Sequence, residues 1–482
     1  MPSDGFAWAS AFSGRCRRSG PGWKVALAIF VFTWTLTTHG KYSASGDEPH
    51  YLMIAHSIVV DHDMDVGNNY AENDGRFFGH DGLVMGLHAV PALNGHIRPI
   101  HNVGLAVALA PVYALALQAA SLPSDATLRR FRMSRGLFAY SIVSLFLIAV
   151  TSFGLILLGR GLAQETGDPG VASLLVLAGG LSPPILSHAF LVFPEVAAIF
   201  VTCLALWVSL KPHGASDRLA LFGTVLALGL LPWTHNKYLL YVVGLAGVVV
   251  WRRRDLVQAL SRVERVFLVL VGALPIVGLQ LWLWREWGTL GGALTTGGVP
   301  FSASMLKTGL PGLFFDRQSG LLAYAPLYWI VPACWGLTFR RNWPLLIPVA
   351  LLYVPAAAFT IGWWAGFSPA ARYIAPLMPI CLVVVGGALR NRAVQVVFAA
   401  LLCFQAVIDV VVWRTPRTLW PADGGNPALH AIGWFGRAYE SLLPPLQVAP
   451  AGAWVAAILV ALAAGSAALV VSAYPKAHAP ER

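Results

Sequence analysis

The sequence predicts an all-α membrane protein with about twelve transmembrane helices and additional interfacial helices. Two observations lead to this fold class. The chain is 57% hydrophobic and only 11% charged, which is typical of polytopic membrane proteins. Apolar runs of roughly the 20 residues that a spanning helix needs also recur along its 482 residues.

The first apolar run covers residues 25–38 and follows a basic N-terminal segment, Arg15 to Lys24. By the positive-inside rule, the N-terminus lies in the cytoplasm and the next segment lies outside. That segment, residues 41–101, is the longest polar stretch, and residues 51–60 within it predict a short interfacial helix. The later apolar runs lie near residues 103–121, 136–158, 171–187, 190–210, 219–233, 238–251, 266–284, 320–338, 343–362, 374–389, 393–412 and 452–473.

Basic clusters between these runs decide the expected sidedness. If residues 103–121 cross the membrane, Arg252–Arg254 fall outside. If residues 103–121 lie in the interface or re-enter, the clusters at 252–254, 340–341 and 390 all fall inside, and Arg129–Arg135 are left outside. We favour the second arrangement, because several clusters outweigh one and a proline interrupts this run.

In this arrangement, polar segments from distant parts of the chain share the extracytoplasmic face. They are residues 41–101, 188–195, 235–237, 285–318 and 363–373. Ser43-Ala44-Ser45 faintly matches a signal-peptidase site, but we favour an uncleaved anchor helix.

The net charge is +11, from 33 Lys and Arg residues against 22 Asp and Glu residues. In a soluble protein, such an excess would suggest nucleic-acid binding. Here the arginines lie in short loops between apolar segments, so membrane topology explains them and no nucleic-acid partner is expected.

Asp47-Glu48 is the first candidate for chemistry, since adjacent carboxylates just past a spanning helix lie at the lipid–water interface. Apolar surroundings would raise the proton affinity of Asp47 and suit it to general-base work. The alternative is that Asp47 caps the helix that contains His50. One acid of the pair can serve each role.

Two further polar turns interrupt apolar runs. In the first, His188 precedes Pro194-Glu195, where Glu195 either suits a helix N-terminus or acts as a functional intramembrane acid. In the second, His235-Asn236-Lys237, the lysine either snorkels to the interface or holds a phosphate.

Asp316-Arg317 and Arg372 complete the candidates. Asp316 and Arg317 can pair locally or cap the next helix. Arg372 follows Trp363-Trp364 and is either an anchor in an aromatic belt or a guanidinium fork for a lipid phosphate, which we favour.

The other polar residues of the 41–101 segment give weaker indications of function. The alternating acids Asp61, Asp63 and Asp65 resemble part of a calcium loop but lack its glycine and distal glutamate, so we expect a solvated turn. The scattered histidines lack ligand spacing and are interpreted as loop residues: His80, His88, His96 and His101.

Together, these motifs resemble the GT-C superfamily of integral-membrane glycosyltransferases, such as protein O-mannosyltransferases and lipid A aminoarabinose transferases. The resemblance is carried by Asp47-Glu48-Pro49-His50-Tyr51 after the first helix, then Phe193-Pro194-Glu195, Phe315 to Leu322, and Trp363 to Tyr373. It implies a catalytic transmembrane module over residues 1–412, with residues 413–482 forming an extracytoplasmic loop and a terminal helix. It also implies the bacterial cytoplasmic membrane, with the site facing the periplasm.

The resemblance further implies transfer of a sugar from a polyprenyl-phosphate donor to a glycan or lipid acceptor, with inversion. Asp47 would be the base, aided by Glu48. The cations expected at the donor phosphate are Arg372, Lys237 and Arg317. The residues expected near the substrates are His50, Tyr51, His188, Glu195, His235, Asp316, Trp363 and Trp364. No cofactor is certain, and a divalent cation is left open.

Two features separate this chain from aminoarabinose transferases: His50 stands where they have arginine, and no Lys-Pro-Pro segment occurs.

The alternative function is a transporter or flippase of polyprenyl-linked saccharides. Transporters place charges at the bilayer midplane on paired broken helices, whereas here the polar residues gather on one face without an evident repeat.

Overall fold

The structure is a computed structural model. It describes residues 22–37, 46–211, 217–293, 302–358, 362–421, 425–447, 462–463 and 465–466. The basic N-terminal segment, the Ser43-Ala44-Ser45 motif and nearly all of the predicted terminal helix lie outside these residues.

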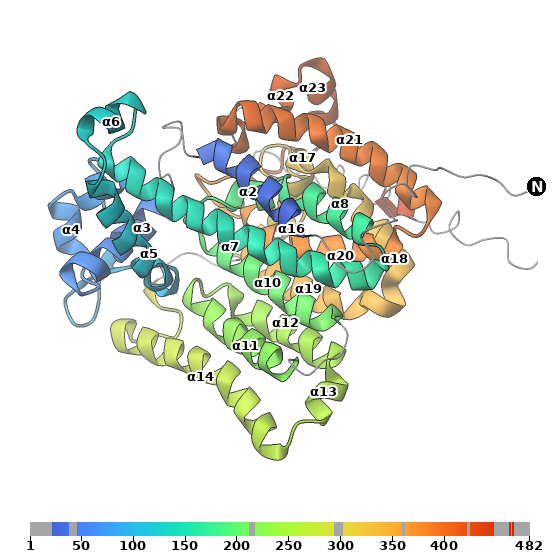
Figure 1. The fold of residues 1–482 in the computed structure, drawn as a ribbon, viewed down its shortest axis with the longest axis horizontal. Helices are drawn as coiled ribbons and strands as arrows, with labels where there is room; N and C mark the ends of the chain where they lie inside the picture. The colour runs from blue at the N-terminus through green and yellow to red at the C-terminus, as the bar shows by residue number, and fades with distance from the viewer. Residues whose placement is uncertain are drawn as a thin grey trace, which may run out of the picture.

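The first helix and the polar segment after it contain short elements, and α3 continues into the π-helical turn η1 as the predicted interfacial helix. The elements from α3 to α6 form one end of the molecule, on the left in Figure 1, whereas α2 packs against α7 nearer the middle. Their bounds are α2 (Trp23–Thr37), α3 (Glu48–His56), η1 (Ser57–Asp61), α4 (Gly67–Ala71), η2 (Asp74–Phe78), β1 (Ala89–Pro91), β2 (Ile97–Pro99), α5 (Gly104–Ser121) and α6 (Asp125–Arg130).

The long helix α7 runs from this end across the molecule (Figure 1). The described residues in the middle of the chain form helices joined by short turns. Its elements are α7 (Arg135–Thr166), α8 (Pro169–Gly180), α9 (Ile185–His188), α10 (Pro194–Leu210), α11 (Asp217–Leu230), η3 (Leu231–Trp233), α12 (Tyr238–Arg252), α13 (Arg254–Gln258) and α14 (Arg262–Trp287).

The described residues in the last third of the chain are mostly helical as well. Tyr439 donates a hydrogen bond to the Leu322 carbonyl, so residues after 413 pack against the preceding helices. The elements are α16 (Ala303–Phe315), α17 (Leu321–Tyr324), η4 (Pro326–Ile330), α18 (Val331–Asn342), η5 (Trp343–Leu345), α19 (Leu346–Ala358), η6 (Arg372–Leu377), α20 (Met378–Ala388), α21 (Arg392–Arg414), η7 (Pro416–Leu419), α22 (Pro427–Ala431) and α23 (Trp434–Glu440).

The described residues confirm the predicted helical class, and their two short strands form a single hairpin. Among the described residues, four helices are long and apolar enough to span a bilayer: α5, α7, α14 and α21. Shorter apolar helices of 10–17 residues accompany them, so the chain is a multi-pass membrane protein, while the expected number of about twelve spans is not established.

Basic residues from distant segments meet at one end of the helices. Arg341 pairs with Glu165 at 2.7 Å and Arg252 donates to Asn342 at 2.8 Å, while Arg390 donates to the Thr166 carbonyl at 3.2 Å. These contacts gather three of the clusters that the charge count assigned to one side. The helices α10, α12 and α20 begin at the opposite end, which we call the polar end.

The helix α5 lies beside the part of α7 that extends beyond this polar end. Its first residue, Gly104, packs against Trp233, and Arg135 at the start of α7 donates to the carbonyl of Ala120 near its end. At about 1.5 Å per residue, the 32 residues of α7 are longer than the bilayer core is thick. Since α5 is itself apolar and long enough to span, the arrangement in which residues 103–121 do not cross the membrane stays a prediction.

Candidate active site at the helix ends

Four charged side chains from distant segments meet at the polar end, and we call them the charge cluster: Asp47, Glu195, Lys237 and Arg372. Arg372 donates from Nη1 to Asp47 Oδ2 at 2.7 Å and from Nε to Glu195 Oε1 at 3.2 Å. Lys237 Nζ donates to the same Glu195 oxygen. Only Asp47 among the four is substantially accessible, with 25% of its side chain exposed.

Local sequence explains why these residues converge. Pro194 opens α10, so Glu195 lies in its first turn, and Lys237 directly precedes α12. Gly46 has φ +59°, and a Cβ there would lie 2.4 Å from the Phe367 carbonyl oxygen. The glycine therefore lets the Asp47 turn approach the loop that ends in Arg372.

Asp47 is not the raised-pKa carboxylate expected from its apolar surroundings. Burial raises its pKa, but the charge and hydrogen bond of Arg372, together with the charges of His101 and His88, outweigh burial and lower it. Asp47 also occupies the N-cap position of α3 without a side-chain cap hydrogen bond. Its carboxylate is therefore held by Arg372 rather than by the helix backbone.

Glu195 and Lys237 form the buried half of the cluster, with relative exposures of 0% and 5%. Glu195 Oε2 is itself buried and has no hydrogen-bond partner among the described residues. Burial lowers the pKa of Lys237 to about 8, although its pairing with Glu195 opposes the shift.

The other residues of the Asp-Glu motif face different partners. Glu48 is fully buried, and its Oε1 accepts from Tyr140 at 3.0 Å and from the backbone of Val192 at 2.8 Å. His50 contacts the Tyr70 hydroxyl at 2.6 Å, and Tyr51 lies under the His101 ring with centroids 4.8 Å apart. Glu48 therefore ties α3 to α7 and to the turn before α10.

The two predicted histidines flank the cluster from the polar turns. His188 is buried, and its Nδ1 contacts the Pro184 carbonyl at 2.9 Å, while its Nε2 has no partner among the described residues. His235 Nδ1 accepts from the backbone N–H of Lys237 at 3.1 Å and so shapes the turn that presents this lysine.

The segment around Asp316 contacts the backbone directly before Arg372. Asp316 Oδ1 accepts from the backbone of Gln318 and Ser319, both at 2.9 Å, which forms a tight turn. The Ser319 carbonyl then accepts from Ala371 at 2.9 Å, directly before Arg372. No contact joins the Arg317 side chain to the cluster among the described residues.

Trp363 and Trp364 pack as hydrophobic residues, with ring centroids 5.6 Å apart in an edge-to-face arrangement. Trp363 is 2% exposed and lies against Gly312 of α16. In the described part of the chain, no polar or ring contact joins either tryptophan to the charge cluster.

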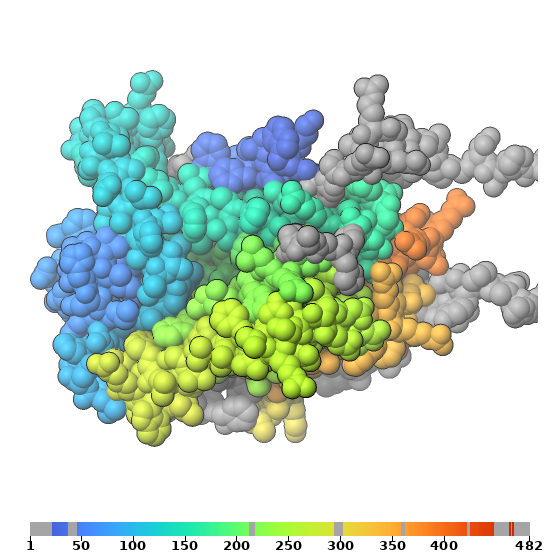
Figure 2. All heavy atoms as spheres, turned by 60° about the horizontal axis from the view of Figure 1, so that its bottom comes forward, coloured from blue at the N-terminus to red at the C-terminus, as the bar shows by residue number. Residues whose placement is uncertain are grey.

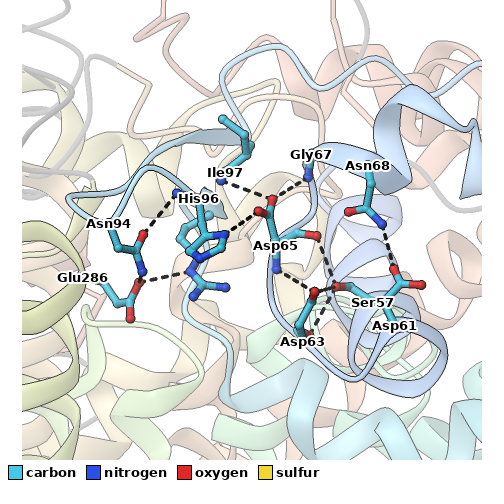
Figure 3. A network of polar contacts seen from close by, with 11 residues as sticks. Ser57, Asp61, Asp63, Asp65, Gly67, Asn68, Asn94, His96, Ile97 and Glu286 are labelled. Atoms are coloured by element: carbon cyan, nitrogen blue, oxygen red, sulfur yellow. Dashed lines mark hydrogen bonds and ion pairs between the residues drawn. The ribbon is translucent and has the colours of Figure 1, made fainter.

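The alternating acids of the first loop accept hydrogen bonds from other residues of the same loop (Figure 3). Asp65 accepts from His96 at 2.7 Å and from the backbone of Ile97 and Gly67. Asp63 accepts from Ser57, and Glu286 of α14 binds Arg98 of the hairpin at 3.0 Å. Figure 2 shows the end of α14 against the first-loop elements, which this ion pair joins.

His88 and His101 were interpreted as loop residues, but they lie against Asp47. One ligand atom from each of these three residues lies within 4.8 Å of the other two. Burial lowers the pKa of His101 to about 4 despite the nearby Asp47 charge. Sequence spacing gave no sign of this group, because the β1–β2 hairpin brings the two histidines together.

Fold and site together define an α-helical multi-pass membrane protein with a partly accessible charge cluster where several helices begin. Comparison with protein-family models and with curated proteins gives no match.

Solved structures give partial likenesses. The chain is similar to ArnT from Cupriavidus metallidurans bound to undecaprenyl phosphate, with 16% identity, coverage of 94% of this chain and 74% of that chain, and a TM-score of 0.43. It is also similar to the Archaeoglobus fulgidus oligosaccharyltransferase in the apo form, with 12% identity, coverage of 93% and 56%, and a TM-score of 0.37. The Archaeoglobus fulgidus oligosaccharyltransferase AglB, in complex with an inhibitory peptide and a dolichol-phosphate, gives 12% identity, coverage of 92% and 55%, and a TM-score of 0.36.

Proposed function

We propose that this protein is a GT-C-like membrane glycosyltransferase that moves a sugar from a polyprenyl-phosphate donor to a glycan or lipid acceptor. The charge cluster carries the proposal. Two cations and two carboxylates, drawn from four distant segments, meet at the end of apolar helices, where a lipid phosphate and a polar acceptor can both arrive.

The donor phosphate would bind at Arg372 and Lys237. Three helices, α3, α10 and α12, begin beside these cations, so their N-terminal dipoles add to the positive potential. Arg372 is held over the Phe193 ring at 4.1 Å, which orients its guanidinium without occupying its donors. Charge that develops on the departing phosphate would be stabilised there.

Asp47 would deprotonate the acceptor hydroxyl as the oxygen attacks the anomeric carbon from the face opposite the phosphate, which inverts that carbon. Its pairing with Arg372 links donor binding to base strength. A donor phosphate competes for the guanidinium, and a weaker Arg372 pairing allows the pKa of Asp47 to rise. Glu195 Oε2 would accept a hydroxyl of the sugar.

The extracytoplasmic face of a bacterial cytoplasmic membrane is the proposed location, because the cluster lies opposite the end where Arg252, Arg341 and Arg390 meet. Inversion, the periplasmic orientation and the role of Arg317 as a third cation belong to the same proposal.

The test uses purified protein in lipid vesicles that contain undecaprenyl-phosphate-linked radioactive sugars and a lipid or glycan acceptor. We expect label on the acceptor and free undecaprenyl phosphate, both strongly reduced in Arg372→Gln. The exposed Arg130→Gln is the matched control and should retain transfer. If the sugar stays on its carrier and only changes leaflet, the protein is a flippase and the proposal is wrong.

A further inference from the structure

Three potential metal ligands converge from separate positions of the first loop. Asp47 begins α3, His88 directly precedes β1, and His101 follows β2 by two residues. The hairpin pairs Ala89 with Pro99, and the backbone of Ile100 donates to the His88 carbonyl at 2.9 Å. Antiparallel pairing therefore holds both imidazoles at the same end of the hairpin, facing Asp47.

The spacing of the ligand atoms suits a single ion. His88 Nδ1 and His101 Nε2 lie 3.0 Å apart and share a hydrogen bond. Two nitrogens bound to one tetrahedral zinc at about 2.0–2.1 Å are roughly 3.3 Å apart, so the two imidazoles would accommodate the ion with a shift of a few tenths of an ångström. The Asp47 oxygen lies within 4.8 Å of both nitrogens and would move toward the ion. The shared proton would move to the other nitrogen of its own ring, which leaves both imidazoles neutral and both lone pairs directed at the metal.

Neighbouring rings hold the ligands in place. His50 stacks on His88 with centroids 3.5 Å apart and planes 9° apart, and the Tyr70 hydroxyl contacts His50 at 2.6 Å. On the other side, Tyr51 packs against His101. This orientation reduces the rotamer entropy that binding must overcome.

We propose that Asp47, His88 and His101 bind a divalent transition-metal ion of the Zn²⁺ type. Two nitrogen ligands favour such an ion over Mg²⁺ or Ca²⁺, which take oxygen ligands. Three protein ligands leave a position open for water or a substrate oxygen. Arg372 binds Asp47 through Oδ2, so the ion would adjoin the charge cluster through the same carboxylate.

Binding itself does not depend on sugar transfer, so the two proposals can fail separately. The test uses tag-free, chelator-treated full-length protein in detergent and titrates it with Co²⁺ and Zn²⁺. Visible absorption of bound Co²⁺ reports coordination, and elemental analysis after desalting reports zinc stoichiometry. Mg²⁺ serves as the contrasting ion.

We expect one Zn²⁺ per chain, a cobalt spectrum typical of four-coordinate nitrogen and oxygen ligands, and a higher melting temperature with zinc. His88→Gln, His101→Gln and the isosteric Asp47→Asn should each weaken binding by about tenfold or more. His62→Asn is the matched control, since His62 is exposed in the same loop at φ 62°, a conformation that asparagine tolerates.

The proposal is wrong if the wild type retains no zinc, or if the folded His101→Gln and Asp47→Asn variants bind it as the wild type does. Should either glutamine variant fail to fold, Asp47→Asn decides, because it removes a ligand charge without changing side-chain volume.

Discussion

At the scale of single residues, Asp47 has three roles that compete for its carboxylate: ion-pair partner of Arg372, proposed general base and proposed metal ligand. In the structure described, it is the partner of Arg372 and its pKa is lowered. As the proposed base, it needs the opposite shift. The first two roles are compatible if the bound donor phosphate attracts Arg372 away from Asp47, because the pKa of Asp47 then rises before the acceptor reacts.

Asp47→Asn should therefore abolish sugar transfer while leaving the fold intact. Loss of a general base lowers rates by about 10²–10⁴-fold. Undecaprenyl phosphate binding, followed by native mass spectrometry, should be retained, because Arg372 and Lys237 remain. Near-normal turnover in this variant would exclude Asp47 as the base.

Glu195 matters for stability, because it is the fully buried carboxylate that Lys237 and Arg372 share. Glu195→Gln should destabilise the protein by about 3–5 kcal/mol, since Lys237 then loses its buried counter-charge, while Arg372 keeps its pair with Asp47. Denaturant unfolding in detergent measures this change.

The double variant Glu195→Gln/Lys237→Met is the control for that prediction. It removes one unpaired charge and should recover part of the lost stability. A single variant as stable as the wild type would show that the pair is not buried as described.

At the scale of elements, one buried histidine adds a polar contact to the apolar interface between α3 and α5. His56 is 2% exposed, and its Nδ1 contacts the Tyr113 hydroxyl at 2.9 Å. Burial lowers the pKa of His56 from its usual 6.5, although Asp74 opposes the shift. The folded protein therefore disfavours the charged form.

The stability that this histidine contributes is present above its unfolded pKa near 6.5 and is lost as the pH falls below it. Between about pH 7.5 and 5, the wild type should lose a few degrees more in melting temperature than His56→Gln, which cannot be protonated there. Equal losses in the two proteins, measured in the same detergent, would contradict this.

The sequence predicted the helix after Asp47 but not the turn formed by Asp316. The helix predicted over residues 51–60 is present but begins three residues earlier, because Pro49 favours a helix start at Glu48. Its place at the membrane interface stays a prediction. Asp316 was read as a pairing or capping residue, whereas it organises a turn whose Ser319 carbonyl supports Arg372. That contact joins residues far apart in the chain, which no local pattern reports.

At the scale of the whole molecule, the helices have a basic end and a polar end. The prediction that Arg252, Arg341 and Arg390 share a side agrees with their contacts at one end. Which side of the membrane this end faces remains a prediction from the positive-inside rule.

Membrane-impermeant labelling tests that orientation. In a background with Cys16 and Cys403 replaced by serine, we expect Glu72→Cys and Arg130→Cys to react from outside intact cells. Arg254→Cys, at the basic end, should react only after permeabilisation. All three positions are exposed, so burial does not limit labelling. Reaction of position 254 from outside would reverse the proposed sidedness.

The sequence by itself determined the membrane class, the gathering of basic clusters, and Asp47, Glu195, Lys237 and Arg372 as the charges of interest. Hydropathy and charge are properties of local composition, so a charged residue at the end of an apolar helix can be recognised from the linear sequence. Only the tertiary structure decided how these charges pair and that His88 and His101 meet Asp47. Both depend on contacts across tens to hundreds of residues, and the Arg372 charge reverses the pKa shift that burial alone would impose on Asp47.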